Sequence, residues 1–421
     1  AKDTEQAREK LMKRFKLSVI QAQAILDMPL KRLASLERKK LEQEYKDLLD
    51  LVKELQGLLK SEAKRRQAVV LELNEIKEKY NDRRKTQIVT LTKGKVAADL
   101  LTVKEVTPVE NVWISLTKEG KIAKTSEKNP PRLGGREAPI SVLKSDSHQN
   151  LYLVSRSGKC SCMGVQPLPL VESIEKGSDF YRVTAFNEGD LPVAMFCLSN
   201  EQKTSETLCV TTLSRQGMIK KSMISELPGP SSDLFTLCKV NDGDELGWVM
   251  INESDNHYLI ATKYGMAIRF AGSDVRAMGL VAAGVNALKL AKDDEVAGLD
   301  EISKGQEVAV IASDGKGWHM KEDAFPLQGR YGQGVITCKL KPDSFIVGLK
   351  VGKKNQQIAL HLKKAAAKII RIDEIPSGNR ATVGKSIIEL KPGDEIQNIV
   401  TINETIDLDA NAKKMVQKTL L

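Results

Sequence analysis

The sequence predicts a multidomain α plus β protein, in which a helical N-terminal region precedes a larger all-β region with a propeller-like fold. Apolar residues recur at spacings of three and four up to about residue 80, whereas short β-branched runs broken by Gly and Asp begin near residue 88. In the second region two sequence elements alternate with a period of about 50 residues. Such a period, with about four short strands per unit, is typical of a propeller.

The helical region carries the apolar seam of a coiled coil. Alternating spacings of four and three join Leu41, Tyr45, Leu48, Val52, Leu55 and Leu59, and the same spacing returns at Val69, Leu73, Ile76 and Tyr80 after the polar stretch "SEAKRRQ". The preceding segment "KLSVIQAQAILDMPLKRLASLE" predicts short apolar-faced helices, with Pro29 at the start of a new one. A seam needs a partner helix, and the sequence offers no second arm. We therefore expect the chain to begin within a longer protein and the seam to be exposed.

The repeated elements define six units between residues 105 and 403. The first element is a strand, a turn and a basic strand, as in "VWISLTKEGKIAKT", "LYLVSRSGKCSCM", "LCVTTLSRQGMIKKS", "YLIATKYGMAIRF", "VAVIASDGKGWHM" and "IALHLKKAAAKIIRI". The second element is marked by Asp190, Asp244, Asp294, Ser344 and Asp394, at successive spacings of 54, 50, 50 and 50. Both elements keep their order in nearly every unit, which favours a propeller over a β-sandwich with chance similarity.

Composition limits the class of protein. The 421 residues are 41% hydrophobic and 29% charged, the balance of a globular protein, with no apolar run of membrane-spanning length and no secretory signal at "AKDTEQAREK". We therefore predict a cytoplasmic protein without a membrane partner. The six cysteines form no CxxC pair and the four histidines are scattered, which disfavours a zinc site or a disulfide framework.

Positive charge is in excess but unevenly spread. Lys plus Arg outnumber Asp plus Glu by 65 to 55; residues 1–90 carry 22 basic and 15 acidic side chains, and the remainder carries 43 and 40. A nucleic-acid partner of the larger region therefore requires its basic residues to gather on one surface.

The loop "NPPRLGGREAP", residues 129–139, is too rich in proline and glycine for a helix or an inner strand. Turn chemistry explains its prolines and glycines, but not the arginines that flank the glycine pair. Glycines let backbone amides approach phosphate oxygens, and arginines supply charge-assisted contacts. The loop is thus a candidate backbone grip on a nucleic acid; taken alone, a solvated surface turn is the simpler interpretation.

Both halves of the chain, in their order, resemble a known family. The run from "LSVIQAQAILDMPLKRLASLERKKLEQEYKDLL" to "ELNEIKEKYNDRRKTQI" is similar to the dimerising gate and returning coiled-coil arm of the A subunit of bacterial type IIA topoisomerases, DNA gyrase and topoisomerase IV. The six units resemble the DNA-wrapping β-pinwheel of that subunit. The implied domains are a gate segment (1–35), a coiled-coil arm (36–87), a linker (88–104), a six-bladed β-pinwheel (105–403) and a C-terminal tail (404–421).

The resemblance gives the arginine-flanked loop a function. In gyrases a first-blade loop carries the pattern Q-R-R-G-G-(K/R)-G, which is needed for DNA wrapping, and residues 131–137 occupy those places here. Arg132, Gly134, Gly135 and Arg136 are kept, whereas the Gln, the second Arg and the last Gly are lost and Glu137 adds a negative charge. A second stretch, "QGRYGQG", retains Gln328, Arg330, Gly332 and Gly334. The departures weaken the expectation of gyrase-type negative supercoiling and leave gyrase and topoisomerase IV both open.

A curved basic rim would bend DNA at a cost offset by many phosphate contacts. The remaining candidate rim residues are Lys121, Lys124, Lys220, Lys221, Arg269, Arg276 and Arg380. For each of them a solvated charge on a strand is an equally good interpretation.

The residues that would cut DNA are not found in the sequence. The family's catalytic tyrosine follows an arginine on a winged helix; Arg330 and Tyr331 lie instead in a blade loop, and no GxxxxGK[ST] phosphate loop occurs. We assign no catalytic residue, metal or cofactor to this chain. The resemblance implies that a partner ATPase B-type subunit binds Mg²⁺ and ATP in an A2B2 complex, and that the gate forms a homodimer. A propeller scaffold that binds protein without DNA is the alternative function, and an independent enzyme is a third class for which no site is found.

Overall fold

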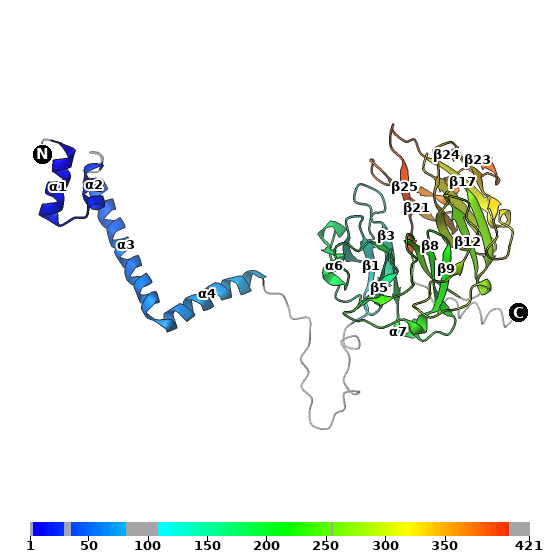
Figure 1. Cartoon of the computed structure of the whole chain (residues 1–421), viewed down its shortest axis with the longest axis horizontal. Helices are drawn as coiled ribbons and strands as arrows, with labels where there is room; N and C mark the ends of the chain where they lie inside the picture. The colour runs from blue at the N-terminus through cyan, green and yellow to red at the C-terminus, as the bar shows by residue number, and fades with distance from the viewer. Residues whose placement is uncertain (1–2, 29–34, 81–107, 254–255, 404–421) are drawn as a thin grey trace, which may run out of the picture. The chain divides into compact units, whose positions relative to one another are not determined.

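The computed structural model describes residues 3–28, 35–80, 108–253 and 256–403, and the chain divides into two compact units, residues 1–89 and 90–421 (Figure 1). The first unit is helical, and the described strands all lie in the second unit, together with the short helices α6 (Phe180–Val183) and α7 (Asn200–Lys203) and several 3-10 turns. The predicted linker at 88–104, the tail at 404–421 and the helix start at Pro29 lie outside the described residues.

Four helices make up the first unit: α1 (Thr4–Phe15), α2 (Val19–Leu26), α3 (Ser35–Lys60) and α4 (Glu62–Tyr80). The start of α2 is fixed by a capping box, in which the Ser18 hydroxyl accepts from the Gln21 backbone N–H and the Gln21 side chain accepts from the Ser18 backbone N–H. The separation of α3 from α4 falls at Ser61, the first residue of the polar stretch that interrupts the seam.

The seam is exposed within this chain, as predicted. Leu48, Val52 and Leu55 of α3 are 54%, 46% and 49% exposed. Apolar side chains spaced for a coiled coil therefore form a continuous solvent-facing stripe along the helix.

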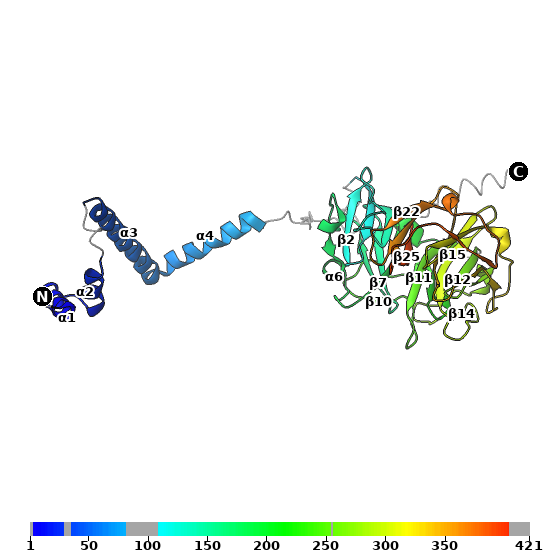
Figure 2. The ribbon, with the colours of Figure 1, turned by 90° about the horizontal axis from the view of Figure 1, so that it is seen from above.

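Six blades, each a β-sheet, form the described part of the second unit and confirm the predicted pinwheel (Figure 2). A separate two-stranded sheet pairs β19 (Cys338–Lys339) with β23 (Thr382–Val383). The innermost strands of neighbouring blades contact one another, and the shortest strands lie at the outer edge. From the inner to the outer edge, blade 1 consists of β3 (Ser141–Asp146), β1 (Asn111–Leu116), β2 (Lys121–Ser126) and β6 (Ser178–Asp179), and blade 2 of β7 (Pro192–Leu198), β4 (Asn150–Ser155), β5 (Lys159–Gly164) and β10 (Phe235–Thr236). In the same order, blade 3 consists of β11 (Leu246–Glu253), β8 (Leu208–Ser214), β9 (Met218–Met223) and β14 (Val285–Asn286), and blade 4 of β15 (Val296–Ile302), β12 (His257–Thr262), β13 (Met266–Ala271) and β18 (Val335–Ile336). Blade 5 consists of β20 (Ile346–Gly352), β16 (Glu307–Ala312), β17 (Lys316–Lys321) and β24 (Lys385–Ser386), and blade 6 of β25 (Ile396–Val400), β21 (Gln357–Leu362) and β22 (Lys368–Arg371).

Each outer strand comes from the following blade. The loop that leaves β13 of blade 4, for example, supplies β14, which pairs with β9 of blade 3 through Val285 and Ile219. Five blades gain a fourth strand in this way. Blade 6 has three strands, fewer than the four predicted, because the loop from blade 1 meets it through a single bridge between Gly135 and Ala367. The short strand β26 (Ile402–Asn403) runs parallel to β3 and joins the chain's last described residues to blade 1.

Three of the repeated aspartates form hydrogen bonds with the backbone of hairpin turns. The carboxylates of Asp244, Asp294 and Asp394 accept hydrogen bonds, 2.9 to 3.1 Å long, from the backbone N–H groups of Gln216, Tyr264 and Lys364 in the turns of blades 3, 4 and 6. Each also accepts from the residue that follows it. The aspartates of blades 3, 4 and 6 therefore hold the hairpin turns in place, whereas Asp190 accepts from the Asn187 N–H and blade 5 has Ser344 at the equivalent position.

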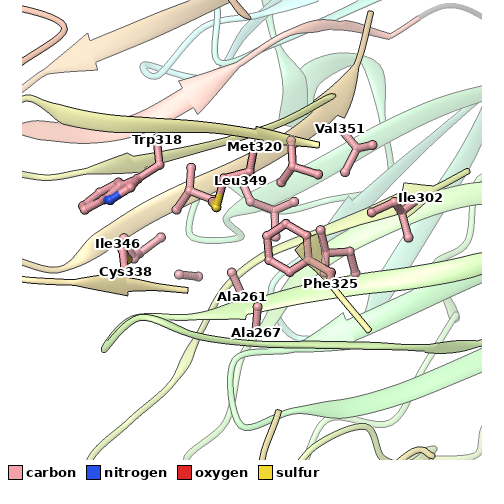
Figure 3. Close-up of a cluster of buried hydrophobic side chains, with 14 of the residues drawn as sticks. Ala261, Ala267, Ile302, Trp318, Met320, Phe325, Cys338, Ile346, Leu349 and Val351 are labelled. Atoms are coloured by element: carbon pink, nitrogen blue, oxygen red, sulfur yellow. The ribbon is translucent and has the colours of Figure 1, made fainter. Parts of the chain in front are cut away.

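The core lies between blades. In the cluster of Figure 3, Trp318 of β17 and Leu349 of β20 pack with Ala261 and Ala267 of blade 4, and Phe325 lies among them from the loop after β17. All five side chains are at most 5% exposed. Because each cluster of this kind draws on two neighbouring blades, the ring is held together by burial as well as by strand exchange.

Candidate nucleic-acid interface

The arginine-flanked loop lies at the junction of blades 1 and 6. Gly135 donates its N–H to the Ala367 carbonyl at 3.0 Å and accepts from the Ala367 N–H at 2.8 Å. Its φ of +106° is a conformation that favours glycine. The side chains of Arg132 and Arg136 are exposed, and among the described residues neither forms an ion pair. Gly135 is thus needed for a backbone contact within the ring, and a Cβ on Gly134 would lie 3.3 Å from the Ile369 side chain. The two guanidinium groups are directed to solvent.

Leu133 anchors the same loop from the inside. It is 3% exposed and packs with Val142 of β3, Ala359 of β21 and Val400 of β25. Two of these strands belong to blade 6 and one to blade 1. The loop that the sequence marks for nucleic-acid binding therefore also closes the ring.

A group of carboxylates lies beside the loop. The exposed Glu137 side chain shares a hydrogen bond with Glu175, and this bond, together with the negative charges of Glu175 and Glu119, raises the pKa of Glu137. These three carboxylates lower the positive potential that Arg132 and Arg136 create.

Four predicted rim residues lie in the third strand of a blade and point into the protein. Lys124, Lys220 and Lys221 are 6%, 1% and 3% exposed, and Arg269 is half-buried. The prediction that these side chains face DNA is therefore wrong. A positive charge on a strand was counted as a surface charge, although its long side chain has internal partners.

These buried cations hold the crossing loops in place. A crossing loop is the segment that leaves the third strand of one blade and runs along the outer edge of the preceding blade. The ammonium groups of Lys124 and Lys221 donate to the carbonyls of Gln166 and Gly272, at 2.7 and 2.8 Å, and the Arg269 guanidinium donates to the Glu322 carbonyl at 3.2 Å. Each acceptor lies in the loop that arrives from the next blade.

The Lys220 ammonium donates to the Leu280 carbonyl in the loop from the next blade, at 2.6 Å, and to the Leu237 carbonyl in the loop that leaves its own blade, at 2.7 Å. Burial lowers the pKa of Lys220 to about 8. Burial is also the larger cause of the lowered pKa of Lys124, where Glu110 acts in the opposite direction.

The second predicted stretch, residues 328–334, lies on an outer crossing loop. Arg330 is part-exposed and donates from Nε to the Asp274 carbonyl at 3.2 Å, which ties its loop to the preceding one. Arg380 occupies the same place one blade on and contacts the Ile336 carbonyl at 3.4 Å. Gly334 has a φ of +77°, and a Cβ there would meet the Ala267 carbonyl oxygen at 2.3 Å.

The other members of the predicted set differ in exposure. Gln328 and Gly332 are part-exposed on the same loop as Arg330. The Lys121 ammonium lies 2.6 Å from the Asp179 carboxylate, so its charge is largely neutralised. Arg276 is exposed and, among the described residues, forms no ion pair.

Three exposed lysines at the outer edge were missed by the sequence prediction. Lys239, Lys289 and Lys339 each follow an outer crossing strand, and among the described residues none of them forms an ion pair. They are 50 residues apart and precede the repeated Asp or Ser marker by five residues. The 50-residue spacing could have identified these lysines from the sequence, because residues at equivalent positions of successive repeats lie on the same surface.

No catalytic arrangement is found in the part of the chain that the structure describes. No group of three or more His, Cys, Asp or Glu side chains there is placed to hold a metal ion. Tyr331 is 53% exposed and lies on a crossing loop with a φ of +67°. Among the described helices, none is long and apolar enough to cross a bilayer.

Comparisons with known proteins find relatives of both the sequence and the fold. The family described as DNA gyrase C-terminal domain, beta-propeller, matches residues 256–303, 306–353 and 363–403. The A subunit of DNA gyrase from Halalkalibacterium halodurans is 31% identical over 297 residues, and that from Clostridium acetobutylicum is 32% identical over 301 residues. The chain is therefore similar to the C-terminal portion of bacterial type IIA topoisomerase A subunits.

The match concerns the C-terminal portion of these proteins. Each of the two alignments covers 68% of this chain and 35% of the relative, so the chain spans well under half the length of the curated relatives it matches. Two solved structures share the pinwheel fold: the C-terminal domain of DNA topoisomerase IV (TM-score 0.62, 20% identity, 69% of this chain and 93% of that chain) and the DNA gyrase A C-terminal domain (TM-score 0.58, 16% identity, 70% and 100%).

Proposed function

We propose that the pinwheel binds the backbone of duplex DNA along its outer edge and bends it, as part of a type IIA topoisomerase A subunit. The observation that carries this proposal is the exposed lysine at the same place in successive units, Lys239, Lys289 and Lys339. Cations repeated around a curved edge present a curved positive surface, and phosphate contacts bind DNA without reading its sequence.

The curvature of the surface gives the binding a mechanical consequence. DNA that follows a curved row of cations is bent, which costs several kcal/mol for bends of about 40° to 90° over 20–30 base pairs. Each phosphate contact releases condensed counterions and offsets part of that cost. The expected complex is therefore bent, weakly sequence-dependent and strongly dependent on salt.

Arg132 and Arg136 are proposed as additional phosphate contacts at the junction of blades 1 and 6, supported by their exposed side chains. Arg276, Gln328 and Arg330 are proposed contacts on the crossing loops. Because Glu137 and Glu175 lie beside the two arginines, we expect weaker wrapping there than an uninterrupted Q-R-R-G-G-(K/R)-G loop would give. The proposal covers both a gyrase and a topoisomerase IV.

The wider activity is proposed from the family. The protein would support ATP-dependent double-strand passage and control of supercoiling in an A2B2 complex with an ATPase B-type subunit, which would supply Mg²⁺ and ATP. It would form a homodimer through the helical gate and act on DNA in the cytoplasm. This chain by itself would bend DNA without cutting it.

Binding to labelled duplexes tests the proposal. We expect similar affinities for two unrelated sequences of equal length, a steep fall in affinity between 50 and 200 mM salt, and a change of linking number when a nicked circle is ligated in the presence of the protein. Affinity that is independent of salt, or no binding at low salt, would favour a propeller scaffold for protein partners instead.

A further inference from the structure

The rim lysines occupy equivalent positions that the backbone itself defines. In four successive crossing loops, one residue donates its N–H to the carbonyl of a hairpin turn glycine at 2.8 to 3.0 Å. The donors are Leu237, Ala287, Thr337 and Ile387, and the acceptors are Gly158, Gly217, Gly265 and Gly315. Two residues after each donor stand Lys239, Lys289, Lys339 and Glu389.

All four of these side chains are exposed, and neighbouring loops bring them into one row. The Lys239 N–H donates to the Ala282 carbonyl and the Lys289 N–H to the Gly332 carbonyl, each in the next crossing loop. Lys339 lies in β19 (Cys338–Lys339), which pairs with β23 (Thr382–Val383) of the loop that follows. The row therefore passes from loop to loop along the outer edge.

The residues that continue the row differ on its two sides. At the side of blade 6 the next equivalent residue is Glu389, which reverses the charge. At the side of blade 1 the equivalent residue is Arg182, because Phe180 donates to the Gly120 carbonyl at 2.9 Å in the same way. The exposed Arg182 guanidinium lies 3.3 Å from Asp179, which also pairs with Lys121, so its charge is only partly compensated.

We infer that Lys239, Lys289 and Lys339 form a phosphate track that Glu389 terminates, so that DNA follows an open arc over the junctions from blade 2 to blade 5. This inference rests on the proposed function and adds the path and its end. A carboxylate at the next phosphate position repels the backbone, and the duplex leaves the rim there. The arc covers part of the ring, in contrast to a full turn.

The expected effects follow from counterion release. Each lysine that contacts a phosphate contributes about 0.9 to the slope of log K against log salt. The triple variant K239Q/K289Q/K339Q should therefore reduce the magnitude of the slope by about 2.7. Conversely, E389K should add one contact, raise the magnitude by about 0.9, and increase the shortest duplex length that binds with full affinity.

The test uses the whole chain, a labelled duplex of fixed sequence and salt from 50 to 300 mM. E201K is the matched control, because Glu201 is exposed on α7 (Asn200–Lys203), outside the crossing loops, and its substitution makes the same charge change. Duplexes of graded length give the shortest length that binds with full affinity, and E201K should leave this length unchanged. Thermal unfolding monitored by circular dichroism verifies that the variants fold, as expected for substitutions of exposed side chains.

The outcomes separate this inference from the proposed function. If the wild-type chain binds duplex DNA with a steep salt dependence but the triple variant keeps that slope, the track is wrong and the function stands. If E389K and E201K give the same salt slope and the same shortest duplex length as wild type, Glu389 does not end the track. If the wild-type chain shows no salt-dependent binding, the proposed function itself fails.

Discussion

Replacing Leu133 by alanine should open the junction between blades 1 and 6. The side chain is 3% exposed and is enclosed by Val142, Ala359 and Val400, so the substitution leaves a cavity in a small cluster. Buried Leu→Ala substitutions cost about 2 to 5 kcal/mol, and a surface loop that partly collapses belongs near the lower end, about 2 to 3 kcal/mol. The open junction should then become about 30 to 150 times more populated.

Hydrogen exchange measured by mass spectrometry reads this opening directly. Backbone amides of β3 and β25 should exchange faster by the same factor in L133A, while those of blades 3 and 4 should be unchanged, because the cavity lies at one junction. L191A is the control: Leu191 is 55% exposed, and its truncation should change stability by no more than about 0.5 kcal/mol. Equal acceleration in all six blades, or none at β25, would refute the assignment of this loop as the ring closure.

Three further predictions concern other described residues. R132A/R136A should reduce the magnitude of the salt slope of duplex binding by about 2 without changing sequence preference, and an unchanged slope would make the loop a structural turn alone. Burial raises the pKa of Glu301 to about 7, above its unfolded value, so this group stabilises the fold below about pH 4 and loses that contribution as pH rises through 7. Urea unfolding at pH 5 and pH 8 should therefore differ less for E301Q than for wild type, and an equal difference would contradict this. D294A should lower the free energy of unfolding by about 1 to 3 kcal/mol because the Tyr264 and Glu295 N–H groups lose their acceptor, whereas loss of less than 0.5 kcal/mol would mean that water replaces it.

The hairpins were predictable from the sequence because a strand, a turn and a strand leave a local pattern. The run "YLIATKYGMAIRF" is β12 and β13 with their turn, and the repeated aspartates mark contacts made at the turns. The outer strands were not predictable individually. A strand of two residues such as β14 has no periodicity of its own, and its partner β9 lies more than 60 residues earlier in the chain.

The candidate site was predictable only in part for a related reason. Lys220 and Lys289 both lie within the repeated sequence elements. Lys220 was predicted to lie on the rim, whereas Lys289 was not. The difference between them is tertiary: the Lys220 ammonium reaches the Leu280 carbonyl 60 residues away, whereas Lys289 is exposed on a crossing loop. Local propensity carries no information about such distant acceptors. Exposed loop residues such as Arg132 were easier, because proline and glycine place their loop at the surface.

The exchange of outer strands also sets the order in which the ring can be completed during translation. Blade 3 lacks β14 until Asn286 has left the ribosome, so a nascent blade carries an unpaired edge that its successor covers. Blade 6 differs, since its partner loop around Gly135 is made first and has to wait for Ala367. Contacts so far apart in sequence slow folding, and the waiting edges are sites where chains aggregate. An incomplete ring therefore exposes an unpaired strand edge during synthesis. We expect chains truncated within the ring to aggregate through that edge more readily than the whole chain.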